Sequence, residues 1–313
     1  MKNLVIIGAG ISGLTAAYWL KKSGVEVTIL EKQKVVGGTM RTLHENGWLI
    51  ETGPNSALET TPLFNEMFEG LGILGERLYA DERGNNRYIL RNGKLHALPM
   101  SPGAFLTSSL WTVRGKLRLL KEPFVGKSIR EETIAEFVER RLGREFLDYA
   151  INPFVAGVYA GNPESLSVRV AFPKLYALEE KYGGLIKGMI KGARERKLRA
   201  EKAKDRARMF SFANGMATFP DAIGKYLAGS IQLGSEVTSV KRDGRFTISY
   251  HDEERTHITE ADVVIIATPA FHAAKIVAPL ASSLASSLGD VYYPPVAEVF
   301  LGFKTEQIHR VLD

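Results

Sequence analysis

The sequence predicts an α/β protein whose central parallel sheet is interrupted by a long, mostly helical insertion. Three observations support this prediction. The chain opens on a strand–helix–strand pattern over residues 3–30, and apolar residues recur at helical spacing from about 61 to 205. A further buried strand is then indicated over 261–267. The sheet is therefore expected to combine segments that lie far apart in the sequence.

The first strand–helix–strand unit follows from its apolar pattern. Residues 3–8 and 25–30 are short apolar runs that predict buried strands, and 11–22 place small and apolar residues on a helix between them. Strands joined through a helix run parallel. Residues 42–51 alternate as a hairpin does, with Asn46 and Gly47 at its tip. Strand character returns at 209–213, 231–240 and 245–250.

The turn between the first strand and helix predicts a dinucleotide site. Gly8, Gly10 and Gly13 stand in the spacing G-x-G-x-x-G, and Ile11 and Ser12 open the helix. Gly8 permits the tight turn, Gly10 lets a pyrophosphate approach the backbone, and Gly13 allows the helix to pack closely on the strand. The helix N-terminus offers free N–H groups to the phosphates.

Glu31 stands at the end of the second predicted strand. An acid at this position can bind both ribose hydroxyls of an adenosine and would repel a 2′-phosphate. We expect Lys32 beside it to belong to the same cofactor site. The alternative is a glycine-rich turn without a ligand, which is disfavoured because strand, glycines, helix and acid stand in register.

Two later turns favour FAD over NAD as the dinucleotide. Gly38 and Thr39 suit a second pass of the backbone along the pyrophosphate, which Arg41 can bind. A surface salt bridge is the alternative role for Arg41. The turn formed by Gly53, Pro54 and Asn55 is suited to approach a flavin ring.

This extended pattern resembles the flavoprotein superfamily that includes amine oxidases, phytoene desaturases and protoporphyrinogen oxidases. The resemblance implies FAD as the cofactor. It also implies that the backbone of Val237 reaches the adenine and that Thr268 lies at a second strand end that contacts the nucleotide. A plain turn at the end of the strand is the alternative for Thr268.

Three segments, residues 86–99, 152–167 and 210–221, are similar to the protoporphyrinogen and coproporphyrinogen oxidases within that superfamily. The most specific is 152–167, Asn-Pro-Phe-Val-Ala-Gly-Val-Tyr-Ala-Gly-Asn-Pro-Glu-Ser-Leu-Ser. The resemblance implies that Arg87 binds a substrate propionate through two parallel hydrogen bonds and that the carbonyl of Gly157 faces the pyrrole N–H groups. A structural ion pair and a helix-ending glycine are the respective alternatives.

The resemblance further implies an activity. The family oxidises a porphyrinogen, protoporphyrinogen IX or coproporphyrinogen III, to the porphyrin in haem biosynthesis, and molecular oxygen reoxidises the flavin with release of hydrogen peroxide. No catalytic side chain is expected, because the flavin performs the chemistry. Three other functions are left open: a carotenoid desaturase, an amine oxidase, and a non-catalytic fragment that binds a dinucleotide.

The pattern also divides the chain into domains. We expect a discontinuous FAD-binding domain over 1–60 and 209–275, and a mostly helical insertion over 61–208 that faces substrate or membrane. Residues 276–313 are expected to begin a mixed-sheet substrate domain, with a strand starting at 296–303. We therefore interpret the chain as a C-terminally truncated piece that binds FAD weakly or not at all.

Composition excludes several classes of protein. The 313 residues contain no cysteine, which rules out disulfides and thiolate metal sites and fits a cytoplasmic protein. The six histidines lack metal-ligand spacing. The net charge of +6 is concentrated in 187–208, so no broad nucleic-acid-binding face is expected. Residues 105–120 predict either peripheral contact with the inner face of the cell membrane or a core helix, and self-association is left open.

Overall fold

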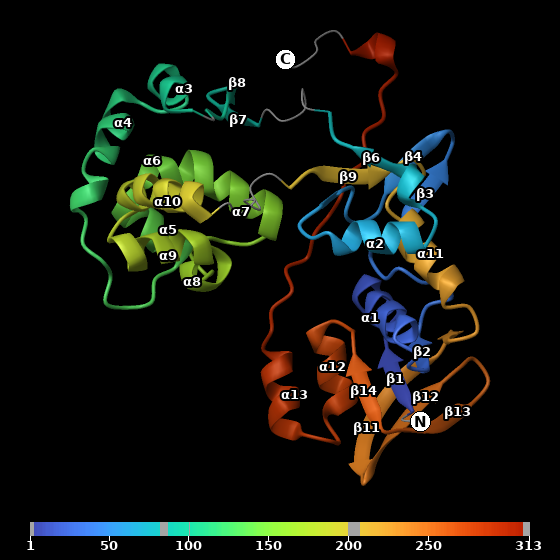
Figure 1. Ribbon diagram of the computed structural model, residues 1–313. Coiled ribbons are helices and arrows are strands. Elements are labelled where there is room, and N and C mark those ends of the chain that lie inside the picture. The colour runs from blue at the N-terminus through green and yellow to red at the C-terminus, as the bar shows by residue number, and fades with distance from the viewer. Residues whose placement is uncertain (1–2, 82–86, 100, 200–206, 309–313) are drawn as a thin grey trace. The chain divides into compact units, whose positions relative to one another are not determined.

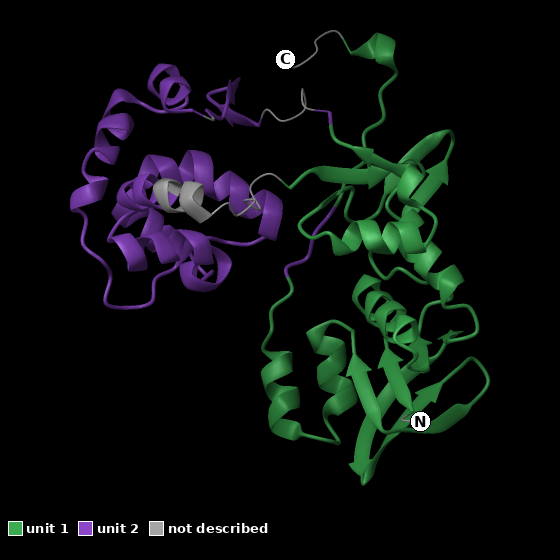
Figure 2. Ribbon diagram, in the orientation of Figure 1, with its two compact units in different colours: residues 1–80, 204–293, 298–309 green, residues 81–203, 294–297, 310–313 purple. Residues whose placement is uncertain are grey.

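The computed structural model describes residues 3–81, 87–99, 101–199 and 207–308, and only the backbone over 193–199 (Figure 1). The chain forms two compact units (Figure 2). Unit 1 comprises residues 1–80, 204–293 and 298–309, and unit 2 is chiefly residues 81–203. The basic stretch 187–208 lies largely outside the described side chains. The finer domain boundaries given above stay a prediction.

A four-stranded parallel sheet organises unit 1, in the order β10-β2-β1-β14. Its strands are β1 (Leu4–Ile7), β2 (Val27–Glu31), β10 (Ile231–Leu233) and β14 (Val263–Ile266). The register places Leu4 opposite both Val27 and Val263. The predicted parallel sheet is therefore confirmed, and its strand order changes direction at β1.

Both faces of this sheet are covered, which explains the uninterrupted apolar run of β1. Leu4 and Ile6 pack into a core with Leu14 of α1 (Ile11–Lys22) and Ile223 of α11 (Thr218–Tyr226). Val5 and Ile7, which point to the other face, pack with residues of β11 (Glu236–Asp243), β12 (Arg245–His251) and α12 (Ala270–Val277). Alternate residues of a strand point to opposite faces, so a strand buried on both faces is apolar throughout.

The strand predicted at 245–250 is confirmed as β12, whereas the one predicted at 231–240 is two strands. The segment 231–240 is divided into β10 and β11 at Gly234, where a φ of +67° turns the chain. A further strand, β13 (Thr256–Ala261), pairs with β12 and was not predicted. Its residues Thr-His-Ile-Thr-Glu-Ala are largely polar and half-exposed, as is usual for the edge of a sheet. The helix α13 (Ser282–Gly289) follows α12.

A second layer of unit 1 is built from small antiparallel pieces. Strands β5 (Ala57–Leu58) and β6 (Arg77–Tyr79) flank β9 (Met209–Phe212), beside α2 (Leu63–Gly70) and the short helix η1 (Leu74–Glu76). Phe68 of α2 meets Phe210, Phe212 and Phe219 at ring-centroid distances of 5.0–5.5 Å. The hairpin of β3 (Thr42–Glu45) and β4 (Trp48–Glu51) is confirmed, with positive φ at Asn46 and Gly47.

The strand expected at 296–303 is not formed. Residues 291–304 have neither helix nor strand, and the short helix η6 (Thr305–Gln307) follows them. Pro294 and Pro295 precede the segment and donate no backbone hydrogen bond. Val296, Val299 and Leu301 are 69–78% exposed. A strand forms only where a neighbouring strand pairs with it, and the apolar pattern of a segment does not show whether such a neighbour is present.

Unit 2 is mostly helical, as predicted. Apart from the hairpin of β7 (Tyr88–Arg91) and β8 (Lys94–Ala97), it contains α3 (Pro102–Thr107), α4 (Val113–Leu119), η3 (Glu122–Phe124), α5 (Ile134–Arg141), α6 (Arg144–Phe146), η4 (Leu147–Ile151), α7 (Asn152–Tyr159), α8 (Val168–Ala171), α9 (Pro173–Tyr182) and α10 (Leu185–Arg199). Its core includes Leu110, Trp111, Ile134, Phe137 and Val155.

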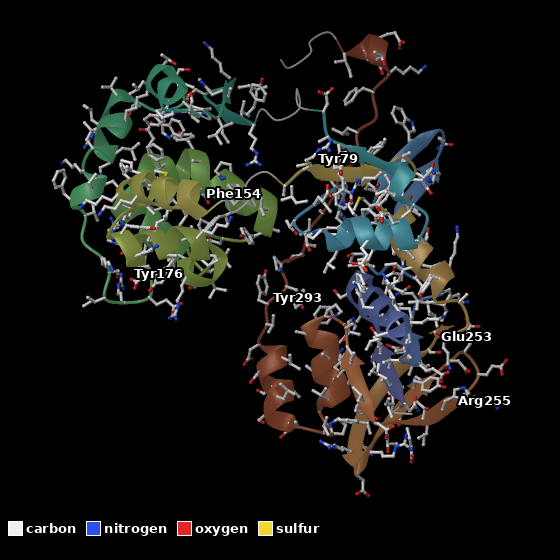
Figure 3. The ribbon with its side chains drawn as sticks, viewed as in Figure 1. Tyr79, Phe154, Tyr176, Glu253, Arg255 and Tyr293 are labelled. Atoms are coloured by element: carbon white, nitrogen blue, oxygen red, sulfur yellow. The ribbon has the colours of Figure 1, made fainter. Side chains whose placement is uncertain are left out.

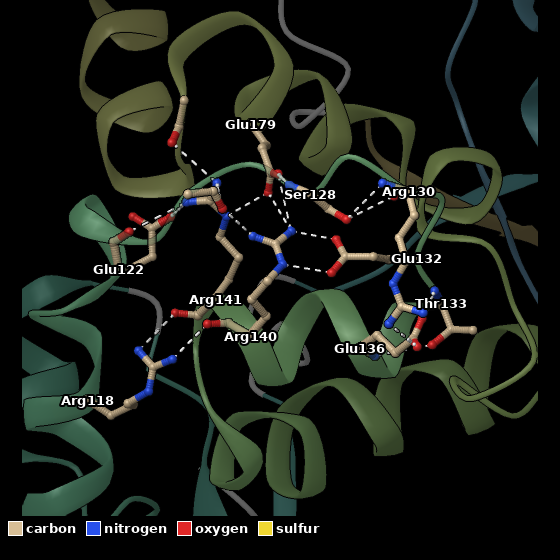
Figure 4. A network of polar contacts seen from close by, with 12 residues as sticks. Arg118, Glu122, Ser128, Arg130, Glu132, Thr133, Glu136, Arg140, Arg141 and Glu179 are labelled. Carbon is tan, nitrogen blue, oxygen red and sulfur yellow. Dashed lines mark hydrogen bonds and ion pairs between the residues drawn. The ribbon is translucent and has the colours of Figure 1, made fainter.

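A buried network of charges joins the helices of unit 2 (Figure 4). The Arg141 side chain is fully buried, and it pairs with Glu122 at 2.9 Å and Glu179 at 2.6 Å. Arg140 forms two parallel hydrogen bonds with Glu132 and also contacts Glu179. Glu122 additionally accepts the first two amides of α10. Every charge in this network is thus hydrogen-bonded, which is the condition for burying it.

The network makes stability depend on pH. Burial alone would raise the pKa of Glu179, but hydrogen bonds from Arg141, Arg140 and the Ser128 amide outweigh burial and lower it. The stabilisation is fully present above the pKa of an unfolded glutamate, about 4.3. It is lost as the pH falls through the lower pKa of the folded state.

We predict that Arg141→Met destabilises unit 2 by about 3–5 kcal/mol, because it leaves Glu122 and Glu179 buried without their partner. The surface change Arg144→Gln, which removes a 3.0 Å pair with Asp148, should cost less than about 0.5 kcal/mol. Hydrogen exchange of the α5 and α9 amides measures the loss of stability in each variant. Equal losses of protection in the two variants would contradict the prediction.

Candidate dinucleotide site

A cavity of about 820 Å³ opens at the carboxyl ends of β1, β2 and β14. This is the edge of an open parallel sheet at which ligands bind, where the strand order changes direction. Most residues assigned to the cofactor from the sequence line it, and they come from turns after all three strands and from β11. They are Gly8, Gly10, Ile11, Ser12, Glu31, Lys32, Gly38, Thr39, Arg41, Val237 and Thr268.

Four residues assigned to the cofactor do not line the cavity. A side chain on Gly13 would place its Cβ 2.0 Å from the carbonyl oxygen of Gly8, so this glycine sets how closely α1 approaches β1. A Cβ on Gly53 would lie 2.0 Å from the carbonyl oxygen of Thr39, so Gly53 supports a wall of the cavity from behind. Pro54 and Asn55 continue that turn, and their approach to a flavin ring stays a prediction.

Two glycine turns meet at the pyrophosphate end. Gly8 has a φ of +105°, and its N–H donates to the carbonyl of Leu30 at 2.8 Å. The Gly37 N–H donates to the Ala9 carbonyl at 2.9 Å. This bond brings the second turn close to the first, so that a Cβ on Gly38 would lie 3.2 Å from the Gly10 Cα. Among the described residues, no side chain caps the N-terminus of α1 at Gly10. Its amides are therefore available to an anion.

Two backbone amides hold the Glu31 side chain in place. Its side chain is buried, and its two carboxylate oxygens accept the N–H groups of Ala9 at 2.6 Å and Gln33 at 2.8 Å. Each oxygen retains a further lone pair for a hydroxyl donor. A dinucleotide whose ribose hydroxyls donate to Glu31 therefore fits the cavity.

Unsatisfied polar atoms support a polar ligand. In the described part of the chain, three buried side-chain atoms lack a hydrogen-bond partner: Arg41 Nε, Thr268 Oγ1 and Trp111 Nε1. Arg41 and Thr268 both line the cavity. A buried donor without a partner costs about 1–3 kcal/mol, which a bound phosphate or hydroxyl would recover. The residues present thus fit a dinucleotide with a pyrophosphate.

Sequence reasoning missed further residues of the cavity. Gln33, Ser235, Glu236, Thr238, His272 and Lys275 also line it, beside Thr52 of the turn that precedes Gly53. His272 and Lys275 belong to α12, which follows β14 as α1 follows β1. A second strand-to-helix turn at this sheet edge was the available signal. Burial lowers the pKa of His272, and the nearby cations Lys32 and Lys275 lower it further, against an opposing effect of Glu236.

We predict that Gly10→Ala and Gly13→Ala affect the protein differently. A Cβ at Gly10 meets no protein atom within 4 Å, whereas one at Gly13 overlaps the backbone of Gly8. Gly10→Ala should therefore keep the unfolding temperature and weaken FAD binding about tenfold or more, because only the ligand is displaced. Gly13→Ala should lower both.

Thermal unfolding and quenching of flavin fluorescence measure the two effects. A Gly10→Ala variant that binds FAD as tightly as the wild type would show that the pyrophosphate does not approach this glycine.

Known proteins are similar to this chain over nearly all of its length. The family model described as flavin containing amine oxidoreductase matches residues 11–312. Protoporphyrinogen oxidase 2 of Arabidopsis thaliana is 32% identical over all of this chain and 66% of its own length. Coproporphyrinogen III oxidase of Bacillus subtilis is 31% identical over 96% of this chain and 67% of its own length. The chain thus spans about two thirds or less of these curated relatives, and 60% of a rice relative.

A solved structure from Exiguobacterium sp. 255-15, whose protoporphyrinogen oxidase activity is itself a provisional assignment, matches with a TM-score of 0.69. It is 24% identical, and the match covers 88% of this chain and 61% of that one. It supports the fold alone. The cavity, its glycine turns and Glu31 accommodate the adenine dinucleotide that a flavin oxidoreductase requires. The chain therefore belongs to the flavin-containing amine oxidoreductase family, and its cofactor is FAD.

Proposed function

We propose that the chain functions in the oxygen-dependent oxidation of a porphyrinogen, protoporphyrinogen IX or coproporphyrinogen III. The supporting observation is the similarity, over 96–100% of the chain, to relatives that bear both names. The residues lining the cavity would hold FAD, which would supply the redox chemistry of a six-electron oxidation with oxygen as the final acceptor. The protein's own residues bind and orient the substrate.

Two arginines of the segment 86–99 have different surroundings. Arg91 pairs with Glu145 at 2.7 Å and lies over the ring of Tyr149, 4.0 Å from its centroid. Arg87 is exposed where the β7–β8 hairpin begins, and its carbonyl accepts the N–H of Leu98 at 2.7 Å. Arg91 is therefore structural. The exposed guanidinium of Arg87 supports the proposal that it binds a substrate propionate, because its fork matches a carboxylate.

Gly157 lies in the exposed last turn of α7. The amide that would bond its carbonyl in a longer helix, that of Gly161, lies outside α7, so the carbonyl is suited to a ligand. A Cβ here would meet no atom within 4 Å. Phe154 and Tyr159 flank it with rings 6.4 Å apart, and Phe154 is marked in Figure 3. These features support a flat ring facing the Gly157 carbonyl.

We predict that Arg87→Ala weakens porphyrin binding about tenfold, since it removes a charge-assisted pair of hydrogen bonds. The shift of the porphyrin absorption band on titration with coproporphyrin III measures the affinity. Lys94→Ala, on the exposed side of the same hairpin, should leave it unchanged.

The oxidase reaction itself is followed by the appearance of porphyrin fluorescence and peroxide from the porphyrinogen, with FAD added. A wild-type chain that retains FAD without this turnover would contradict the proposed function. It would instead identify a dinucleotide-binding protein without oxidase activity.

We also propose peripheral contact with a membrane through unit 2. None of the helices in the described part of the chain combines the length and the apolar character that crossing a bilayer requires. However, α4 and η3 expose an apolar face at helical spacing, formed by Val113, Leu117, Leu120 and Phe124, which are 56–88% exposed. Arg114 and Lys121 lie beside this face in the sequence. An apolar face with flanking cations suits the surface of an anionic bilayer.

We predict that Leu117→Asp with Leu120→Asp lowers binding to phosphatidylglycerol vesicles at least about tenfold, because each buried leucine contributes about 1.5–3 kcal/mol. Ile129→Asp, at a fully exposed apolar residue outside α4 and η3, is the control. Vesicle sedimentation measures the bound fraction. Equal effects of the control and the double variant would argue against a specific membrane-contacting face.

A further inference from the structure

Basic side chains gather at the Glu31 end of the cavity. Lys32 follows β2, and His272 and Lys275 lie on α12; all three line the cavity. The Nζ atom of Lys32 is 3.4 Å from Nε2 of His272. Glu236 of β11 also lines this part of the cavity. A cation thus stands near the carboxylate that is placed to bind the ribose.

The chemistry of the Lys32–His272 contact fixes its direction. An ammonium group has only donors, so Lys32 donates and the imidazole accepts through Nε2, with its proton on Nδ1. The imidazole must be neutral to accept. Burial of His272 and its two lysine neighbours favour that neutral form by lowering its pKa, and only Glu236 acts in the opposite sense.

We propose that His272 is a positioning residue that holds the Lys32 ammonium against the adenosine half of the dinucleotide. A ribose hydroxyl that donates to Glu31 keeps lone pairs that an ammonium can bind from another side. Glu31 and Lys32 then both form hydrogen bonds with the ribose. A lysine side chain loses rotamer freedom when it binds a ligand. Because His272 already holds the Lys32 side chain before the ligand arrives, less of that freedom is lost on binding. The inference concerns the cofactor and holds whichever substrate is oxidised.

The test uses ADP-ribose, which carries the adenosine and the diphosphate without a flavin. Calorimetric titration of the full chain gives its affinity. Lys32→Met and His272→Ala should each weaken binding about tenfold, as expected for one hydrogen bond from a charged group. The double variant should be no weaker than Lys32→Met, because the two residues act through one contact.

Lys34→Met is the matched control. It removes the same charge two residues further on, where the ammonium pairs with Glu253 at 2.5 Å on the surface, on the loop marked in Figure 3. It lies outside the cavity lining. Its affinity for ADP-ribose should match that of the wild type.

A second variant and the pH dependence of binding distinguish the positioning role of His272 from a merely structural one. His272→Gln supplies an amide oxygen as acceptor and should restore the affinity lost in His272→Ala. Wild-type affinity should fall as the pH drops through the lowered pKa of His272, since imidazolium repels Lys32. His272→Gln should show no such fall, because the diphosphate of ADP-ribose does not titrate between about pH 5 and pH 8.

The inference is overturned if the wild type does not bind ADP-ribose, if the losses add in the double variant, or if His272→Gln fails to restore affinity. The porphyrinogen assay is independent of these. Loss of oxidase activity with normal ADP-ribose binding speaks against the proposed function alone. Normal ADP-ribose binding in Lys32→Met speaks against this inference alone.

Discussion

The close approach of backbone at Gly8 and Gly13 is the constraint on which the rest of unit 1 depends. The carbonyl oxygen of Gly8 occupies the space that a Cβ of Gly13 would need, 2.0 Å away. This contact seats α1 directly on β1 and aims its free amides into the cavity. Gly38 stands against Gly10 in the same way, so the second glycine turn closes the wall. A larger side chain at Gly13 would separate α1 from β1, the two elements that begin the site.

The sequence predicted the parts of this site that depend on local pattern. The β1–α1–β2 unit, the hairpin tip at Asn46 and the acid at Glu31 are set by residue types a few positions apart, and each is found where expected. The strand β14 was also predictable, because a short uninterrupted apolar run is typical of a parallel strand that is buried on both faces.

The sequence could not predict parts that depend on pairing between distant segments. His272 and Lys275 reach the cavity only because β14 pairs with β1, residue 263 opposite residue 4. The edge strand β13 is polar enough to be missed, and the apolar segment 296–303 forms no strand, since an apolar pattern does not provide a partner. Helical spacing likewise did not distinguish the buried Leu110 from the exposed Leu117.

The arginines Arg141 and Arg41 have opposite surroundings, and this contrast separates stability from ligand binding. In unit 2, Arg141 has no exposed surface and its guanidinium reaches two carboxylates and nearby carbonyls, so nothing remains for a ligand to bind. In unit 1, Arg41 and Thr268 keep buried polar atoms without partners, both at the cavity. A folded chain tolerates such atoms where something else completes their hydrogen bonds. The unsatisfied atoms of Arg41 and Thr268 are therefore available to a ligand of the cavity, whereas the paired charges around Arg141 hold helices of unit 2 together.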